Sequence, residues 1–359
     1  MKKMVWFISG LILVSLACRT LQSLQPTATA TQLPAVTQSH TVTQIIASPS
    51  AIEAVPTSTP RPTPQPIICK DDSCLDACLA RIEKAIPQSS PYEPLSGVYG
   101  GDNIDLNLVY YDVENGQLGE PEFLYVPDEF KELQQDTNAH QNVWLYASGL
   151  LPPDKVKWLT GFEIFSSSYY AAWVSPGGSD QSDRSHWILG MDIADAQNPV
   201  DLTYILVHEY GHLVTLNTDQ IPVSDYYYGW YQNPAFCTQF LSPDGCSQPD
   251  SYINLFYQKF WKNIFEEWQN EVEMPKVNTP EEFYALVDKF YEKYSEQFVR
   301  DYAATNIFED LAESFEYFVL EPKPNDKNII AQKIRFFYDF PELVSLRQQM
   351  IQSICSYTQ

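Results

Sequence analysis

The chain has 359 residues, of which 46 are acidic and 22 are basic, so its formal net charge is -24 at pH 7. A protein this acidic repels phosphate backbones instead of displacing their counterions, which argues against nucleic acid as a partner. No apolar run reaches the roughly 20 residues that a membrane-spanning helix requires, which argues against a channel or transporter. The 26 prolines and the 14% aromatic residues indicate a globular core joined to a proline-rich segment.

The N-terminus is typical of a secretory signal peptide. Lys2 and Lys3 precede a mostly apolar stretch over residues 4–16, and Cys18 follows a small residue. A cysteine at this place resembles the bacterial lipobox, in which the cysteine is lipidated and becomes the first mature residue. We therefore expect residues 1–17 to be the signal peptide and Cys18 to anchor the protein by lipid at the outer side of a bacterial membrane or at the cell surface. An ordinary cleaved signal peptide and a short uncleaved anchor are the alternatives.

A low-complexity segment follows the expected lipid anchor. Residues 19–66 are mostly Thr, Pro, Ala, Gln and Ser and carry almost no charge. Such a composition buries too little apolar surface to offset the entropy of ordering the chain. Residues 18–66 are thus predicted to be the lipidated cysteine and a disordered, partly polyproline tether, and residues 67–359 to be the folded domain.

The cysteines of the folded domain indicate disulfides. Six cysteines follow residue 66, and an even number outside the cytoplasm is typical of three disulfides. Cys237 and Cys246 flank a Ser-Pro-Asp-Gly turn, so we expect them to pair. Cys355 should join one of the three cysteines at the start of the domain, Cys69, Cys74 and Cys78. A cysteine zinc site is the alternative, although a double Cys-x-x-Cys spacing is lacking.

The predicted secondary structure changes in kind along the chain. After a helix over 72–85, extended segments rich in Val, Ile, Leu and Tyr cover 98–113, 123–126, 157–166, 170–175 and 186–193. Asn198 and Pro199 favour a helix start, so a helix should run over 198–217. Helices are then expected over 251–271, 279–298, 306–320, 327–339 and 341–353. Strands first and helices last predict an α+β fold.

The helix after Pro199 contains the sequence His-Glu-Tyr-Gly-His from His208 to His212. Residues four apart share a helical face, so both imidazoles can reach a single Zn²⁺. Glu209 can take a proton from zinc-bound water and pass it to a leaving amine. With five histidines in the chain, the motif should arise by chance in under about 1% of such sequences. We expect one zinc per chain and a hydrolytic activity.

A catalytic zinc normally has three protein ligands, so one more ligand must lie elsewhere in the chain. His140 and His186 are candidates, but neither follows His212 at a short, glycine-containing spacing. Glu309 and Glu313 share a helical face among apolar neighbours, where a buried glutamate needs a cation or a hydrogen-bonding partner. A glutamate is therefore the better candidate, and an exposed acidic helix face is the alternative.

The His-Glu-x-x-His motif is accompanied by the pattern Tyr-x-x-Thr-Asn-x-x-Glu-x-x-Ala-Glu-x-Phe, which begins at Tyr302. Together they resemble the family of the anthrax lethal factor catalytic domain, within the gluzincin metallopeptidases. The resemblance implies a zincin-like fold with a mixed sheet, an active-site helix and a helical C-terminal half. It further implies Glu309 as the third zinc ligand and Glu313 as a residue that orients a ligand histidine. Tyr302 would stabilise the oxyanion or protonate the leaving group. The resemblance does not cover residues 19–200.

Two other features have weaker functional interpretations. The aromatic run over residues 226–231 could wall a substrate cleft, but packing near the disulfide loop is the stronger interpretation. Residues 185–192 could form the edge strand that binds an extended peptide by main-chain hydrogen bonds. An ordinary core strand is an equally good interpretation of this segment.

The sequence therefore predicts a surface-anchored, monomeric zinc endopeptidase that acts on a peptide or protein. His208, His212 and Glu309 would hold the metal, with Glu209 as general base. One alternative is a surface protein that keeps the zincin fold and binds without turnover, although the intact Glu209 argues against it. Another is a zinc hydrolase that acts on a non-peptide bond.

Overall fold

The computed structural model describes residues 74, 75, 77–79, 105–167, 170–177, 185–197, 199–222, 237–243 and 245–357. The expected signal peptide, Cys18, the tether and the aromatic run over 226–231 lie outside the described residues. The helix expected over 72–85 is described only within 74–79, where the residues are helical. Among the helices that are described, none combines the length and apolar character needed to cross a bilayer.

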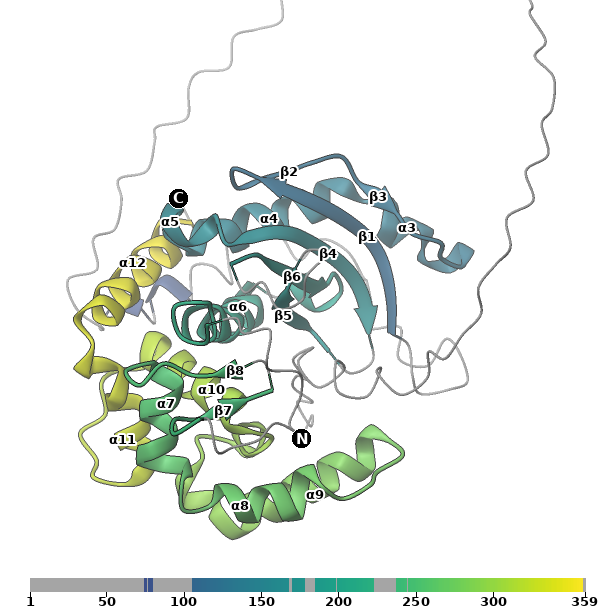
Figure 1. The fold of residues 1–359 in the computed structure, drawn as a ribbon. Coiled ribbons are helices and arrows are strands. Elements are labelled where there is room, and N and C mark those ends of the chain that lie inside the picture. The colour runs from purple at the N-terminus through teal and green to yellow at the C-terminus, as the bar shows by residue number, and fades with distance from the viewer. Residues whose placement is uncertain are drawn as a thin grey trace, which may run out of the picture.

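The first half of the described chain forms a mixed sheet (Figure 1). Its strands are β1 (Asp105–Glu114), β2 (Gln117–Leu118), β3 (Glu122–Phe123), β4 (Leu159–Ser167), β5 (Ala172–Pro176) and β6 (Trp187–Asp192). They are ordered β2-β1-β4-β6-β5, and β3 also pairs with β1. Strands β4 and β6 are parallel, whereas the other pairs are antiparallel. The extended segment expected over 123–126 is a strand only as far as Phe123.

The strand β6 lies inside the sheet and not at its edge. It pairs with β4 on one side and β5 on the other, and Trp187, Leu189 and Met191 are 0% exposed. Of the two interpretations of residues 185–192, the core strand is therefore confirmed and the peptide-binding edge strand is wrong. The physical reason is the order of the strands in the sheet. The chain places β5 at the edge, and the following strand β6 lies between β4 and β5. The edge strand is β5, which pairs antiparallel with β6 alone among the described strands.

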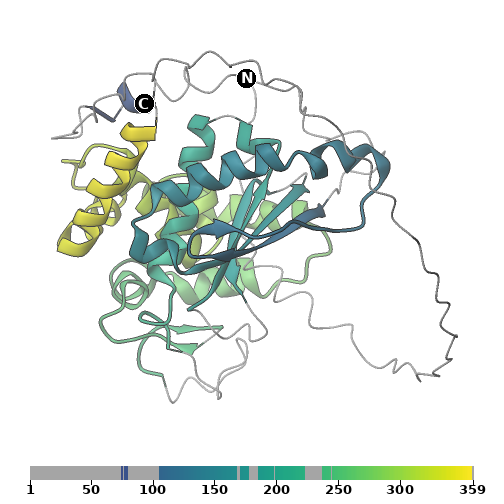
Figure 2. The same cartoon turned by 90° about the horizontal axis from the view of Figure 1, so that it is seen from above.

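Helices pack against the sheet and fill the C-terminal half. The helices before residue 250 are α3 (Lys131–Gln135), α4 (Thr137–Leu150), α5 (Pro153–Val156) and α6 (Pro199–Thr215), with short η2 (Asp128–Phe130) and η3 (Asp195–Gln197). Figure 2, seen from above, shows α4 running across the strands. Helix α6 lies beside α4, where the Tyr210 hydroxyl donates to the Ala147 carbonyl at 2.5 Å. The sheet and these helices enclose one continuous apolar core.

The C-terminal elements are α7 (Tyr252–Phe256), η5 (Tyr257–Trp261), α8 (Phe265–Trp268), η6 (Gln269–Glu273), α9 (Pro280–Tyr294), η7 (Ser295–Gln297), η8 (Asp301–Ala304), α10 (Ile307–Leu320), α11 (Ile329–Phe336), η9 (Phe337–Asp339) and α12 (Pro341–Tyr357). The helices expected over 279–298, 306–320, 327–339 and 341–353 are confirmed with small changes at their ends. The helix expected over 251–271 is divided, because η5 and η6 are π-helical turns. The protein thus has a mixed α+β architecture.

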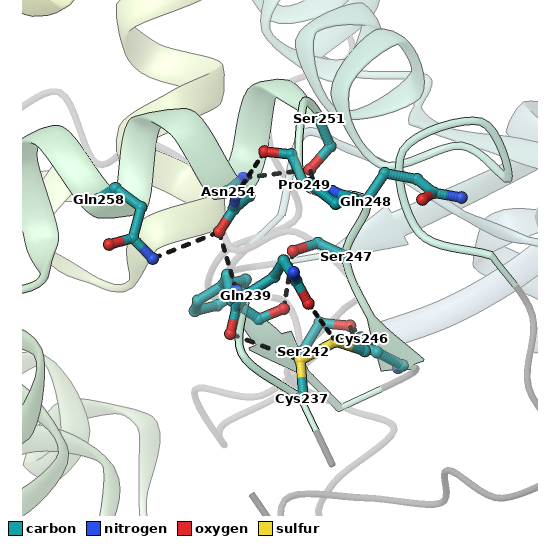
Figure 3. Close-up of a disulfide and its surroundings, with 12 residues drawn as sticks. Cys237, Gln239, Ser242, Cys246, Ser247, Gln248, Pro249, Ser251, Asn254 and Gln258 are labelled. Carbon is teal, nitrogen blue, oxygen red and sulfur yellow. Dashed lines mark hydrogen bonds between the residues drawn. A yellow bond between two sulfur atoms is a disulfide. The ribbon is translucent and has the colours of Figure 1, made fainter. Parts of the chain in front are cut away.

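Two disulfides join described cysteines. Cys78 pairs with Cys355 across 277 positions of sequence, which confirms that Cys355 ties the two ends of the domain together. Cys237 pairs with Cys246, as the turn between them predicted (Figure 3). The loop that this disulfide closes contains β7 (Leu241–Ser242) and β8 (Gly245–Cys246). Asn254 of α7 fixes the loop, because its Oδ1 accepts a hydrogen bond from the Phe240 N–H at 3.0 Å. Since Cys74 is disulfide-bonded too, the cysteines near Cys355 are not a metal site.

Candidate metal centre

The site forms where α6 and α10 pack closely against each other. A Cβ atom placed on Gly211 would lie only 3.1 Å from the Ala312 Cα, so the small residues Gly211 and Ala312 allow the two backbones to approach. Helix α10 begins at a fixed point, because Asn306 Oδ1 accepts hydrogen bonds from the Phe308 and Glu309 N–H groups. The close packing and the cap together place Glu309, in the first turn of α10, opposite the histidines of α6.

His208, His212 and Glu309 converge at this crossing. Glu309 Oε2 lies 3.1 Å from His208 Nε2 and 3.3 Å from His212 Nε2. The two imidazole rings have centroids 4.9 Å apart and are nearly perpendicular to each other. All three side chains are at most 3% exposed. One donor atom from each of them lies within 4.8 Å of the others, so the three residues could hold a metal ion.

The charges of this group are consistent with a cation between the three side chains. Burial alone would raise the pKa of Glu309, but the His212 charge and hydrogen bonds from both imidazoles lower it to about 2. Burial opposes a charge on His208, yet hydrogen bonds to Glu309 and Glu313 raise its pKa well above its usual value. Glu309 Oε1 is also buried without a hydrogen-bond partner among the described residues. A carboxylate that needs a positive charge and has an unused oxygen fits a divalent metal ion.

Glu209 is adjacent to the two histidines in sequence but faces the edge strand of the sheet. It accepts a backbone hydrogen bond from Val174 in β5, and its side chain is 1% exposed. Its Oε2 has no hydrogen-bond partner within the described part of the chain. Burial raises the pKa of Glu209, and the neighbouring His208 and His212 oppose this rise. A buried carboxylate with a raised pKa and an unused oxygen is suited to accept and release a proton.

The other imidazole nitrogen of His208 contacts a second carboxylate. His208 Nδ1 lies 2.9 Å from Glu313 Oε1, one turn after Glu309 on α10. This contact leaves Nε2 of the same ring directed at Glu309. Glu313 is itself fixed by Arg300, whose Nη2 donates to Glu313 Oε1 at 2.6 Å and whose Nε also contacts the carboxylate.

Arg300 and Glu316 are two further members of the site that the sequence analysis did not identify. Arg300 Nη2 donates to Glu316 Oε2 at 2.7 Å, and Glu316 is 2% exposed. His208, Glu313 and Glu316 form a second group with metal-ligand geometry, but the Arg300 guanidinium already supplies a positive charge to both carboxylates. The missed signal was the i, i+4, i+7 spacing of the glutamates on a helix rich in apolar residues. Several buried carboxylates on one helix require more than one positive partner.

Tyr302 lies near His208, His212 and Glu309, the candidate metal-binding group, whereas His140 and His186 do not. The Tyr302 ring, in η8, has its centroid 5.9 Å from that of His208 and is 5% exposed. His140 is buried elsewhere, where its Nδ1 lies 2.8 Å from the Tyr111 hydroxyl and its Nε2 lies 2.9 Å from the Leu133 carbonyl oxygen. His186 is exposed just before β6. Both alternative histidine ligands are therefore excluded from this group.

No protein-family model, curated protein or solved structure matches this chain. The fold and the site define the class of protein in coarse terms. It is an α+β protein in which two helices bring a buried group of two histidines and one glutamate together, and this group could hold a metal ion.

Proposed function

We propose that this protein is a zinc-dependent endopeptidase of the gluzincin type, with a zincin-like fold. The observation that carries the proposal is the convergence of His208 and His212 on α6 with Glu309 on α10. Two imidazole nitrogens and one carboxylate oxygen are a donor set typical of catalytic zinc, which keeps a fourth position for water or substrate. Bound zinc supplies a Lewis acid that lowers the pKa of water and polarises a carbonyl group.

Each neighbouring side chain has a distinct task in this proposal. Glu209 accepts the proton of the attacking water and later gives it to the leaving amine, consistent with its unused Oε2. Glu313, whose Oε1 lies 2.9 Å from His208 Nδ1, orients the ring. Tyr302 packs near the His208 ring, and in this proposal its hydroxyl stabilises the oxyanion or protonates the leaving group.

The edge strand β5 gives the substrate a place to bind. No described strand pairs with its outer side, and its residue Val174 contacts Glu209 directly. An extended peptide can add to such an edge through main-chain hydrogen bonds, which bind a polypeptide with little dependence on its side chains. A peptide on β5 would pass beside the general base, and this favours a peptide or protein substrate over a small ester or amide.

We also propose that the domain acts outside the cytoplasm, anchored to a bacterial membrane by a lipid on Cys18 and held away from it by the tether over residues 19–66. The disulfides Cys78–Cys355 and Cys237–Cys246 support an oxidising compartment.

The test is cleavage of a peptide library by the zinc-loaded full chain, with products identified by mass spectrometry. We expect internal cleavage by the unchanged protein. Glu209→Gln should keep the metal and lose nearly all turnover, because an amide cannot accept the proton of water while the three ligands stay intact. Absence of any cleavage, or equal cleavage by Glu209→Gln, would contradict the proposal.

A further inference from the structure

A tyrosine outside the proposed mechanism has a buried hydroxyl group with no partner in the described part of the chain. Tyr284 lies in the second turn of α9, and its Oη is inaccessible to solvent and makes no hydrogen bond to any described residue. Leaving a hydroxyl group buried and unsatisfied costs free energy that a phenylalanine would not cost. A group of this kind suggests a partner that is absent from the free protein.

The hydroxyl of Tyr284 lies near both the metal-binding group and the edge strand. After burial, the charges of Tyr170 and Glu309 raise the pKa of Tyr284, so both groups are within electrostatic range of its oxygen. Glu309 is one of the three converging side chains, and Tyr170 is two residues before β5. Helix α9 also packs on η8, which carries Tyr302, and in Figure 1 it runs below α6 and β5. The Tyr284 hydroxyl is thus near Tyr170, two residues before β5, and near Glu309 of the metal-binding group.

Tyr294, on the same helix, has a hydroxyl group with a partner. The lack of a described partner at Tyr284 is therefore a property of its position on α9 and not of tyrosine in general. The Tyr294 hydroxyl donates to Glu267 Oε2 at 2.8 Å, on the side of α9 that faces α8 and η6. The hydroxyl of Tyr294 therefore has a protein acceptor, whereas that of Tyr284 has none among the described residues.

An extended peptide on β5 leaves half of its main-chain groups without partners. Its residues alternate in direction, so every second N–H and C=O pair points to β5 and the pairs between them point away. Groups that point away need donors and acceptors from the opposite wall. A neutral phenol is a suitable donor to a carbonyl oxygen, and the raised pKa of Tyr284 keeps it protonated at neutral pH.

We propose that Tyr284 is a substrate-binding residue whose hydroxyl donates a hydrogen bond to a main-chain carbonyl oxygen of a peptide bound between β5 and α9. This inference rests on the proposed endopeptidase function and adds to it a second wall of the substrate site. Because the bond would form equally in the bound substrate and in the transition state, Tyr284 contributes to binding and not to the chemical step.

The first test is stability, with Tyr294→Phe as the matched control on the same helix. Tyr284→Phe removes an unsatisfied hydroxyl group, so its Tm should be unchanged or higher. Tyr294→Phe removes the hydrogen bond to Glu267, so its Tm should fall by roughly 1 to 3 °C. A fall in Tm for Tyr284→Phe as large as that of the control would show a structural partner and overturn the proposal.

The second test is kinetic, with a peptide that the unchanged full chain cleaves in the library assay. Tyr284→Phe should raise KM about tenfold and leave kcat within about twofold, whereas Tyr302→Phe should lower kcat. In the Glu209→Gln background, Tyr284→Phe should weaken binding of the same peptide by a similar factor, and Tyr294→Phe should change none of these values.

The outcomes separate the two proposals. Unchanged KM and peptide affinity in Tyr284→Phe overturn the role of Tyr284 alone, and so does a loss confined to kcat. If the unchanged chain cleaves no peptide, the endopeptidase function fails first, and the role of Tyr284 fails with it.

Discussion

Three buried glutamates of the site are faced by different groups, which suits them to different tasks in the proposed function. Glu309 faces two imidazoles, Glu313 faces one imidazole and a guanidinium, and Glu209 faces the backbone of β5. The pKa of Glu309 is held low, whereas burial raises that of Glu209. The low pKa suits Glu309 to bind a cation, and the raised pKa suits Glu209 to exchange a proton.

Zinc titration can distinguish the ligand glutamate from the orienting glutamate. Glu309→Ala should abolish tight binding, because it leaves an incomplete site without the negative charge that balances Zn²⁺. Glu313→Ala should weaken zinc binding by about 10 to 100-fold, as is usual when a hydrogen bond to a ligand histidine is lost. Retention of zinc in Glu309→Ala with loss in Glu313→Ala would reverse the two assignments.

Arg300 should stabilise the fold more at high pH than at low pH. Its guanidinium neutralises Glu313 and Glu316, and burial and the Glu313 charge already raise the pKa of Glu316 to about 8. Removing the cation raises the pKa of Glu316 further above its unfolded value and removes the charge that helps to hold the pKa of Glu313 low. The folded state then holds protons that the unfolded state releases, so stability falls as pH rises from about 4 to 8.

Urea unfolding of the metal-free variant Arg300→Ala measures this effect. We expect a loss of about 3 to 5 kcal/mol at pH 8, as for other buried ion pairs that lose one partner, and a clearly smaller loss at pH 5. Lys293→Ala is the control, because its partners Glu267 and Glu271 are a third to a half exposed and should contribute under about 1 kcal/mol. A loss independent of pH would contradict the charge argument.

At the scale of elements, helices with polar caps could be predicted from the sequence to within a few residues. Thr279 and Asn306 accept hydrogen bonds from the first N–H groups of α9 and α10, and these local interactions are readable without the fold. Helix α4 was not predicted, although Asp136 Oδ1 caps it by accepting a hydrogen bond from the Ala139 N–H at 3.0 Å. Its buried stripe begins with His140, which counts as polar until its partners on β1 and in α3 are known.

Long-range pairing explains what the sequence could not predict. The apolar spacing over 251–271 indicated one helix, and the structure has π turns η5 and η6 within it. Trp261 and Trp268 of this segment donate to Asp310 and to the Thr305 carbonyl, which are distant in sequence. Spacing likewise placed Glu309 and Glu313 on one face without deciding between them. Only the packing of α10 on α6 shows which of the two faces both histidines, and only the fold brings Arg300 to Glu313.

The close packing of α6 and α10 predicts a specific sensitivity at Gly211. A methyl group there would meet the Ala312 Cα at 3.1 Å and the Phe315 ring at 3.2 Å, so α10 must move away. Gly211→Ala should lower stability by about 1 to 3 kcal/mol and weaken zinc binding, because the histidines and Glu309 separate. Gly149→Ala in α4, with no atom within 4 Å, is the control and should be neutral or slightly stabilising. Equal effects of the two substitutions would contradict the packing argument.

At the scale of the whole molecule, a disulfide at α12 joins the start and the end of the folded part. Cys78 near the start is bonded to Cys355 in α12, and α12 packs on both α4 and α10. Arg347 of α12 reinforces this side by donating to the Phe318 and Glu321 carbonyls. The metal-binding group draws all its residues from α6 and the chain from Arg300 onward, so the disulfide is a constraint on the fold and not a part of the site.

The two disulfides should therefore differ in what they contribute. A disulfide restricts the unfolded chain more when it closes a longer loop, and the separations here are 277 residues for Cys78–Cys355 and 9 residues for Cys237–Cys246. In the chain-entropy model, this difference makes the long-range bond worth roughly 3 kcal/mol more than the local one.

We expect Cys78→Ser/Cys355→Ser to reduce the urea midpoint clearly more than Cys237→Ser/Cys246→Ser, with the same number of bonds removed in each. Zinc affinity, measured where each variant is fully folded, should stay within about twofold for the Cys78→Ser/Cys355→Ser variant, because neither cysteine contacts α6 or Glu309 among the described interactions. An equal loss of stability in the two double variants would show that strain or unfolded-state structure, and not loop length, sets the contribution. A large loss of zinc affinity would instead show that the join between the chain ends positions the site.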